Sequence, residues 1–214
     1  IASQQPGNMP RLMQTWAYDV EQYLIGVLEP RGFERVRYFY KMVRPIDTPL
    51  PDVPLPSGLE IRPVRPDQVR QVWDAKNEAF RDHWGYPDRT EEDYQRWLES
   101  PSFNPSLWKV AWDGDQVAGM VLNFVLEEEN EKFQRRRGYT ENIAVRRPWR
   151  RMGLARALLV ESIRMFREMG MQETTLGVDA ENANGALNLY SVVGYQTKKT
   201  IYTYRKLLQE ENLG

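Results

Sequence analysis

The chain contains a short strand pattern that runs directly into a basic turn and then a long amphipathic helix. Residues 139–145 are partly β-branched and carry a single carboxylate, Glu141, so they predict a strand. Residues 146–153 are rich in arginine and end in glycine, and apolar residues recur at helical spacing from Leu154 onward. The first backbone N–H groups of a helix lack intrahelical partners, and the helix dipole adds positive charge there. The segment therefore predicts a phosphate-binding site.

This turn resembles the acetyl-coenzyme A signature of the GNAT family of N-acetyltransferases. The family pattern, Arg/Gln-x-x-Gly-x-Gly/Ala, stands here as Arg150–Arg151–Met152–Gly153–Leu154–Ala155. Residues 181–190, followed by Gly194–Tyr195, resemble a second family element, Asn-x-x-Ala-x-x-Leu-Tyr-x-x-x-Gly-aromatic. The two elements stand in the family's order and spacing, and the resemblance covers about residues 58–207.

The resemblance implies a fold of the α/β class, in which a central, mixed, twisted sheet has helices on both faces. From Gly58 onward we expect the element order β-α-α-β-β-β-α-β-α-β-β of the GNAT fold. Within this order, the strongly charged residues 127–138 are expected to form a solvated loop or a frayed hairpin extension.

The resemblance also implies where acetyl-coenzyme A binds. The pyrophosphate is expected at six residues of the turn: Arg150, Arg151, Met152, Gly153, Leu154 and Ala155. The pantetheine arm is expected to pair, as an added strand would, with the backbone of Ile143, Ala144 and Val145. Asn182 and Asn188 are expected to hydrogen-bond the pantetheine or the adenosine part, although Asn182 is equally suited to cap a helix. The alternative for the basic turn is that it is simply solvated.

Two residues are candidates for the acid–base chemistry of acetyl transfer. Glu141 lies where the family often has its catalytic glutamate, and we expect it to accept a proton from the amine, directly or through a water. Its alternative role is a cross-strand ion pair, and Glu128 and Glu129 are further candidates for the base. Tyr190 stands where the family has a tyrosine that points at the coenzyme A sulfur, so its hydroxyl can protonate the thiolate. Its alternative role is a core tyrosine. The backbone N–H of Val145 is the implied oxyanion donor.

The loop after the first helix of this domain is expected to shape the acceptor pocket. The motif Phe80–Arg81–Asp82–His83–Trp84–Gly85 resembles one found in GNAT members related to mycothiol synthase, which are also tandem proteins. His83, Trp84 and Glu128 are therefore candidates for substrate contact. For His83, a purely structural role is the alternative.

Composition excludes several classes of chemistry. The 214 residues include no cysteine and one histidine, which excludes disulfides and an acetyl-cysteine intermediate, and we expect no metal. The net charge of −1 supplies no field that would draw the protein to nucleic acid or to a membrane. No apolar run is long enough to span a bilayer and no signal peptide is visible, so we expect a cytoplasmic protein.

The N-terminal part of the chain repeats a pattern found near the C-terminus. Residues 11–28 show helical spacing of apolar side chains, and Gly32–Phe33 and an aromatic-rich strand follow, as a strand also follows Gly194–Tyr195. We therefore expect residues 1–44 to be the C-terminal remnant of a first GNAT-like domain. An unrelated helix and strand is the alternative.

Three further segments complete the predicted organisation. The Pro-rich residues 45–57 are expected to be an extended linker, residues 58–208 the catalytic GNAT domain, and residues 209–214 a tail. We expect the apolar face of the N-terminal fragment to dock on the catalytic domain, on residues before Ile1, or on a second copy, which would give a homodimer.

Together these features predict an N-acetyltransferase that moves an acetyl group directly from acetyl-coenzyme A to a primary amine of a small molecule. Glu141 is the expected base and Tyr190 the expected acid. The alternatives are a non-catalytic GNAT domain that senses acetyl-coenzyme A, and a nucleotide-binding module that uses the same basic turn.

Overall fold

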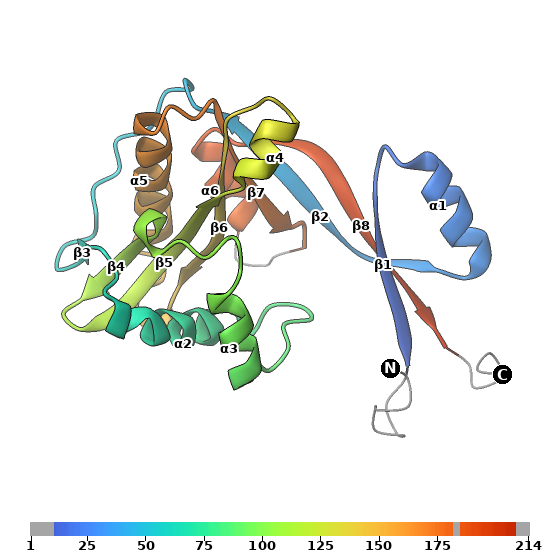
Figure 1. Cartoon of the computed structure of the whole chain (residues 1–214), viewed down its shortest axis with the longest axis horizontal. Helices are drawn as coiled ribbons and strands as arrows, with labels where there is room; N and C mark the ends of the chain where they lie inside the picture. Colours follow the sequence, from blue (N-terminus) through green and yellow to red (C-terminus); the bar gives the residue numbers. More distant parts are fainter. Residues whose placement is uncertain (1–10, 182–184, 209–214) are drawn as a thin grey trace. The chain divides into compact units, whose positions relative to one another are not determined.

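The chain folds into a mixed α/β architecture, as predicted, and its strands form one eight-stranded sheet that includes β1 and β2 (Figure 1). The structure is a computed structural model that describes residues 11–181 and 185–208, so the predicted tail at 209–214 lies outside the described residues. The strands follow the order β1-β8-β2-β7-β6-β5-β4-β3 across the sheet. They are β1 (Leu12–Tyr18), β2 (Glu34–Pro45), β3 (Glu60–Ile61), β4 (Lys109–Asp113), β5 (Gln116–Val125), β6 (Arg137–Val145), β7 (Glu173–Asp179) and β8 (Gln196–Leu207). The α-helices are α1 (Gln22–Leu28), α2 (Val69–Phe80), α3 (Glu91–Leu98), α4 (Glu127–Lys132), α5 (Leu154–Glu168) and α6 (Ala186–Val192). Short 3-10 helices lie at Glu29–Arg31, Pro66–Gln68, Pro105–Leu107 and Arg147–Trp149.

The chain divides into two compact units. Unit 1 comprises residues 1–42, 177–187 and 197–214, and unit 2 comprises residues 43–176 and 188–196. Unit 2 holds most of the predicted catalytic domain together with the Pro-rich segment. The separate origin of the N-terminal fragment stays a prediction.

The N-terminal segment of unit 1 begins with a strand where a helix was predicted. The helix expected over residues 11–28 is wrong, because only α1 is helical and Leu12–Tyr18 forms strand β1. This strand pairs antiparallel with β8 along its whole length. The apolar residues Leu12 and Trp16 fit helical spacing, but pairing with a strand that is distant in the sequence overrides such local spacing.

A small core in unit 1 is made by α1, β1 and β8. Its buried members are Ala17, Ile25, Leu28 and Tyr204. The Tyr204 hydroxyl accepts a hydrogen bond from Arg35 Nε at 2.7 Å and donates to Glu29 at 3.1 Å. The strand predicted after Gly32 is present as β2, whereas the pair of strands predicted at the C-terminus is one continuous strand, β8.

Unit 2 is built on antiparallel strands β3, β4, β5 and β6, and β6 runs parallel to the start of β7. Helix α2 packs on one face through Val72, and α5 packs on the other through Leu154 and Leu158 (Figure 1). Successive side chains of a strand point to opposite faces, so Trp112 lies in the α2 cluster and Ala111 in the α5 cluster. Helices on both faces were predicted, and this prediction is confirmed.

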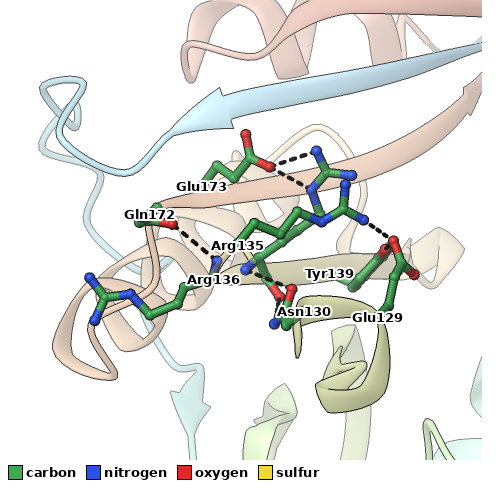
Figure 2. A network of polar contacts seen from close by, with 8 residues as sticks. Glu129, Asn130, Arg135, Arg136, Tyr139, Gln172 and Glu173 are labelled. Carbon is green, nitrogen blue, oxygen red and sulfur yellow. Dashed lines mark hydrogen bonds and ion pairs between the residues drawn. The ribbon is translucent and has the colours of Figure 1, made fainter. Parts of the chain in front are cut away.

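The charged segment at residues 127–138 is more ordered than predicted. The Asn130 side chain donates to the Arg137 carbonyl at 3.0 Å and accepts from the Arg137 N–H at 3.1 Å, in the network of Figure 2. Arg137 also forms an ion pair with Glu173 on β7 at 2.6 Å. The expectation of a loop or frayed hairpin is wrong, because these bonds satisfy backbone groups that would otherwise need water and so fix α4 to the start of β6.

The Pro-rich segment contains no helix or strand over residues 46–59, as expected for a linker. It is nevertheless held within unit 2. The Ile46 N–H donates to the Gln172 carbonyl at 2.9 Å, and Arg167 on α5 donates to the carbonyls of Ile46 and Thr48 at 2.7 and 3.1 Å. The segment is therefore anchored at its start rather than being a free spacer.

Candidate active site

Strand β6 contains one inserted residue at the predicted site. Its pairing with β5 runs from Met120↔Ala144 to Leu122↔Glu141, so β6 advances three residues where β5 advances two. Asn142 has a φ of +50°, a left-handed value that is uncommon outside glycine. Such a β-bulge bends the strand and changes the direction of its side chains.

The bulge changes which face of the sheet each site residue occupies. In a regular strand, Glu141, Ile143 and Val145 would share one face. Ile143 and Val145 do share a face and pack with the α5 cluster, and Ala144 packs in the α2 cluster on the other face. Glu141 is paired across the strands with Leu122, another member of the α2 cluster, so it lies on the α2 face.

The parallel pairing of β6 with β7 is short. Among the described residues, it covers only Arg137–Tyr139 opposite Glu173–Thr175. Beyond Tyr139, the strand continues beside β5 and through the bulge. Where the pairing with β7 ends, the edge of β6 can pair with an extended ligand. This is the role predicted for Ile143–Val145.

The basic turn enters α5 through left-handed residues. Arg151 has a φ of +64°, and Gly153, the N-cap of α5, has a φ of +82°. A Cβ placed on Gly153 would meet no atom within 4 Å, so the space beside this backbone is open. A glycine backbone, open space and a helix N-terminus together suit the binding of a phosphate.

The side chains predicted to hold the pyrophosphate have different environments. Arg150 donates to a backbone carbonyl of β6 at 3.0 Å, so it braces the turn. Arg151 and Met152 are exposed, and Ala155 is half-buried. Leu154 is buried in the core, so only its backbone is available to a ligand.

Tyr190 and Glu141, the two predicted acid–base residues, are brought near each other. Tyr190 on α6 is buried, and burial raises the pKa of its hydroxyl well above the usual value. The negative charge of Glu141 adds to this rise in the Tyr190 pKa, and Glu141 itself is half-buried. The hydroxyl therefore carries its proton at neutral pH. Asn188 is exposed on the same helix, and Asn182 lies outside the described residues.

The predicted acceptor loop packs on aromatic rings. The rings of His83 and Phe80 meet edge to face with centroids 4.6 Å apart, and Phe80 stacks on Tyr86 at 5.8 Å. His83 is half-buried and Trp84 is exposed.

Two ion pairs connect this region to the basic turn. Arg146 pairs with Glu78 of α2 at 2.8 Å, and Arg147 pairs with Asp82 of the loop at 2.6 Å. The acceptor loop and the proposed phosphate turn are thus held together by side chains. Sequence reasoning missed these pairs, because no local pattern joins residues so far apart in the chain.

The other glutamates considered as bases belong to α4. Glu129 accepts a hydrogen bond from the Tyr139 hydroxyl at 2.7 Å and forms an ion pair with Arg135 (Figure 2). Glu128 is exposed on the same helix. Burial raises the pKa of Tyr190, and the charge of Glu141 adds to that rise, whereas Glu129 is engaged by Tyr139 and Arg135.

In the described ranges, no group of three or more His, Asp or Glu side chains is placed to hold a metal ion. Within those same residues, no helix has both the length and the apolar character needed to cross a membrane.

Comparison with known proteins identifies the family. The model of the acetyltransferase (GNAT) family matches residues 69–195. The chain belongs to the GNAT family. It is 30% identical over 179 residues to a mycothiol acetyltransferase of Thermobispora bispora, covering 82% of this chain and 59% of the relative. It is 29% identical over 197 residues to a mycothiol acetyltransferase of Acidothermus cellulolyticus, covering 86% and 59%. This GNAT chain thus spans about three fifths of the length of these curated relatives.

Solved structures share the GNAT fold. A GCN5-related N-acetyltransferase from Sphaerobacter thermophilus superimposes with a TM-score of 0.78 at 28% identity, covering 94% of this chain and 61% of that one. A tandem GNAT protein from the clavulanic acid biosynthesis pathway gives a TM-score of 0.67 at 11% identity, covering 92% and 64%, and so shows a common fold. The GNAT fold predicted from the two motifs is confirmed.

Proposed function

We propose that this GNAT domain transfers an acetyl group from acetyl-coenzyme A directly to a primary amine of a small molecule. The observation that carries the proposal concerns strand β6, which is bulged, carries Glu141 and leads into an open turn. The charge of Glu141 adds to the raised pKa of the buried Tyr190 on α6. GNAT acetyltransferases in general use acetyl-coenzyme A, and the open backbone at Gly153 suits its pyrophosphate.

The proposed chemistry uses one base, one backbone donor and one acid. Glu141 accepts a proton from the ammonium group, directly or through a water, and the neutral amine attacks the thioester carbonyl carbon. The backbone N–H of Val145 stabilises the negative charge on the carbonyl oxygen. The carbon–sulfur bond then breaks, and Tyr190 gives its proton to the departing thiolate. The protonated amide nitrogen loses its extra proton, which returns to the Tyr190 oxygen. The products are an amide and free coenzyme A.

The acceptor is proposed from the relatives and from the aromatic loop. Two relatives of similar sequence are named mycothiol acetyltransferases, so an amino-sugar thiol belongs in the first set of acceptors. His83 and Trp84, with Glu128, are the proposed contacts to the acceptor.

A thiol-release assay across amines, amino acids, aminoglycosides and amino-sugar thiols tests the proposal. Turnover that is confined to one class of amine would identify the acceptor. Tight coenzyme A binding without turnover of any acceptor would favour the sensor, and ATP binding in place of coenzyme A would favour the nucleotide module. Tyr190→Phe should lower kcat by about 10²–10⁴-fold, the usual range for removal of a general acid.

A further inference from the structure

The C-terminal end of α6 is closed by a Schellman motif. Gly194 has a φ of +99° and its N–H donates to the Ser191 carbonyl at 3.0 Å, while the Tyr195 N–H donates to the Tyr190 carbonyl at 3.0 Å. The rings of Tyr190 and Tyr195 meet edge to face, with centroids 6.2 Å apart. Tyr195 is therefore tied to the proposed acid through both backbone and ring.

The Tyr195 hydroxyl lies in a chain of hydrogen bonds that reaches the residue before Glu141. Its oxygen accepts from the Thr174 hydroxyl at 2.8 Å and lies 2.8 Å from the Thr140 hydroxyl, which donates to the Thr175 carbonyl at 3.2 Å. Because the Thr140 proton is used in that last bond, the Tyr195 hydroxyl donates to Thr140. Burial raises the pKa of Tyr195 to about 12, so this donor keeps its proton at neutral pH.

Arg44 holds the same helix end. Its guanidinium is fully buried, with Nε donating to the Val193 carbonyl at 2.8 Å and the other nitrogens donating to the carbonyls of Pro45 and Thr48 at 2.8 and 2.6 Å. Carbonyls at a helix C-terminus carry partial negative charge, which favours a cation there. A Cβ on Gly194 would lie 3.3 Å from Arg44 Nε, so the glycine also makes room for this contact.

We propose that Tyr195 is a positioning residue for acetyl transfer, because its hydroxyl fixes the last turn of α6 to β6 and so sets Tyr190 against Glu141. The inference rests on the proposed function of those two residues. One residue connects both, since the Tyr195 backbone N–H bonds to the Tyr190 carbonyl and its hydroxyl bonds to Thr140, the neighbour of Glu141. Without the hydroxyl, the helix end would keep its Schellman bonds and the Arg44 contact but lose its anchor on β6 and β7.

Tyr195→Phe removes the hydroxyl and keeps the ring. It should lower kcat about 10- to 100-fold and leave the KM for acetyl-coenzyme A unchanged, because a displaced acid slows the chemistry without changing the phosphate turn. Tyr204→Phe is the matched control, since it removes another buried tyrosine hydroxyl, bonded to Arg35 and Glu29, and should leave kcat unchanged. Equal losses in both variants, or a change in KM alone, would overturn the inference. If Tyr195→Phe does not fold, Thr174→Val removes the neighbouring donor and should lower kcat in the same way.

A double variant and hydrogen exchange separate this role from the proposed function. The double variant Tyr190→Phe/Tyr195→Phe should have the same kcat as Tyr190→Phe alone, because the Tyr195 hydroxyl acts by positioning the Tyr190 hydroxyl. Additive losses of kcat in the double variant would contradict this. The amides of Val193 to Tyr195 should exchange faster in Tyr195→Phe and not in Tyr204→Phe. Full activity of Tyr190→Phe would remove the proposed acid and this role with it. If Tyr190→Phe lowers kcat while Tyr195→Phe keeps full kcat and unchanged amide exchange, the positioning role alone is overturned.

Discussion

Gly153 holds the backbone at a φ of +82° in front of α5. We predict that Gly153→Val abolishes coenzyme A binding, because the branched side chain would occupy the open space that suits a phosphate and would resist the left-handed backbone. Calorimetric titration measures the affinity. Gly114→Val is the matched control, since Gly114 in the β4–β5 turn also has a positive φ (+56°) and open space around it. Unchanged affinity in a folded Gly153→Val would exclude this turn as the phosphate site.

Glu141 is the proposed base for an amine that is charged at neutral pH. We predict that Glu141→Gln lowers the rate by about 10²–10⁴-fold near pH 7, and less as the pH approaches about 10.4, where a lysine-like amine loses its proton unaided. A pH–rate profile measures this, with Glu131→Gln on α4 as a control that should leave the profile unchanged. A loss of the same size at every pH would mean that Glu141 is structural.

Lys76 on α2 lies among aromatic rings, with its ammonium 4.0 Å from the ring centroid of Trp73 and 5.0 Å from that of Trp97. Burial lowers its pKa from 10.5 to about 8, and the charge of Arg89 adds to the shift. Because the folded state binds this proton less tightly than the unfolded state, stability should rise with pH between these two values.

We predict that Lys76→Met is more stable than the wild type at pH 7, by on the order of 2 kcal/mol, and that this difference shrinks between about pH 8 and pH 10.5. Urea unfolding across that range measures it. Lys198→Met, which changes an exposed lysine on β8, should show no such pH dependence. A difference that stays constant with pH would mean that Lys76 does not titrate in this window.

At the scale of residues, the sequence singled out the side chains of the proposed chemistry but did not predict which face of the sheet each one occupies. The motif resemblance singled out Glu141 and Tyr190, which the structure places near each other. Period-two alternation puts Glu141 on the face of Ile143 and Val145, and the bulge at Asn142 reverses this. The available signal was the asparagine itself, because asparagine accepts a left-handed φ more readily than most residues.

At the scale of elements, the ends of two helices are built alike. Gly32 donates to the Glu29 carbonyl and Phe33 to the Leu28 carbonyl, at 3.0 and 3.3 Å, which is the same bonding as at Gly194–Tyr195. A strand of 12 residues follows in both cases. This similarity supports our proposal that the N-terminal fragment derives from a first GNAT-like domain.

The two helix-ending glycines differ in their surroundings. We predict that Gly32→Ala costs about 1–2 kcal/mol of unfolding free energy through backbone strain alone. Gly194→Ala should cost more, because its Cβ would also lie 3.1 Å from Thr48 and 3.3 Å from Arg44, while the nearest atom to Gly32 is the flexible end of Lys206 at 3.9 Å. Urea unfolding of both variants measures the difference, and equal costs would show that the crowding at Gly194 relaxes freely.

Two segments adopted a secondary structure other than the one that their local sequence favours, because residues outside the local pattern bond to them. The apolar spacing over residues 11–28 favours a helix, yet its first half pairs with β8. The charges of residues 127–138 favour a solvated loop, yet Asn130 bonds to Arg137 and so orders α4. In contrast, α2 and α5 were predictable, because each has a strong apolar stripe that packs on the sheet.

At the scale of the whole molecule, unit 1 exposes several large apolar side chains. They are Leu12, Met13, Trp16, Val20 and Tyr23. Leu12 and Trp16 share one face of β1, because strand residues four positions apart point the same way. We predict that the chain forms a homodimer at high concentration through this face, because exposed apolar side chains gain free energy by burial. Light scattering of the chain against Trp16→Lys measures this, with Phe133→Lys, which changes an exposed aromatic residue of unit 2, as the control. A monomer at all concentrations, or equal association of all three proteins, would rule out this surface.

The inserted residue in β6 makes this strand sensitive to its length as well as to its composition. Deleting Asn142 would restore regular pairing with β5 while leaving Glu141 opposite Leu122 and Ala144 opposite Met120, so the remaining side chains would keep their faces and the strand would lose its bend. A substitution changes one side chain, whereas this deletion would shift the backbone that carries Glu141 relative to Ile143–Val145. Selection should therefore tolerate length changes in surface loops of this protein far better than a single-residue gap at Asn142, and an evolutionary lineage that lost this residue would need a rearranged site to remain active.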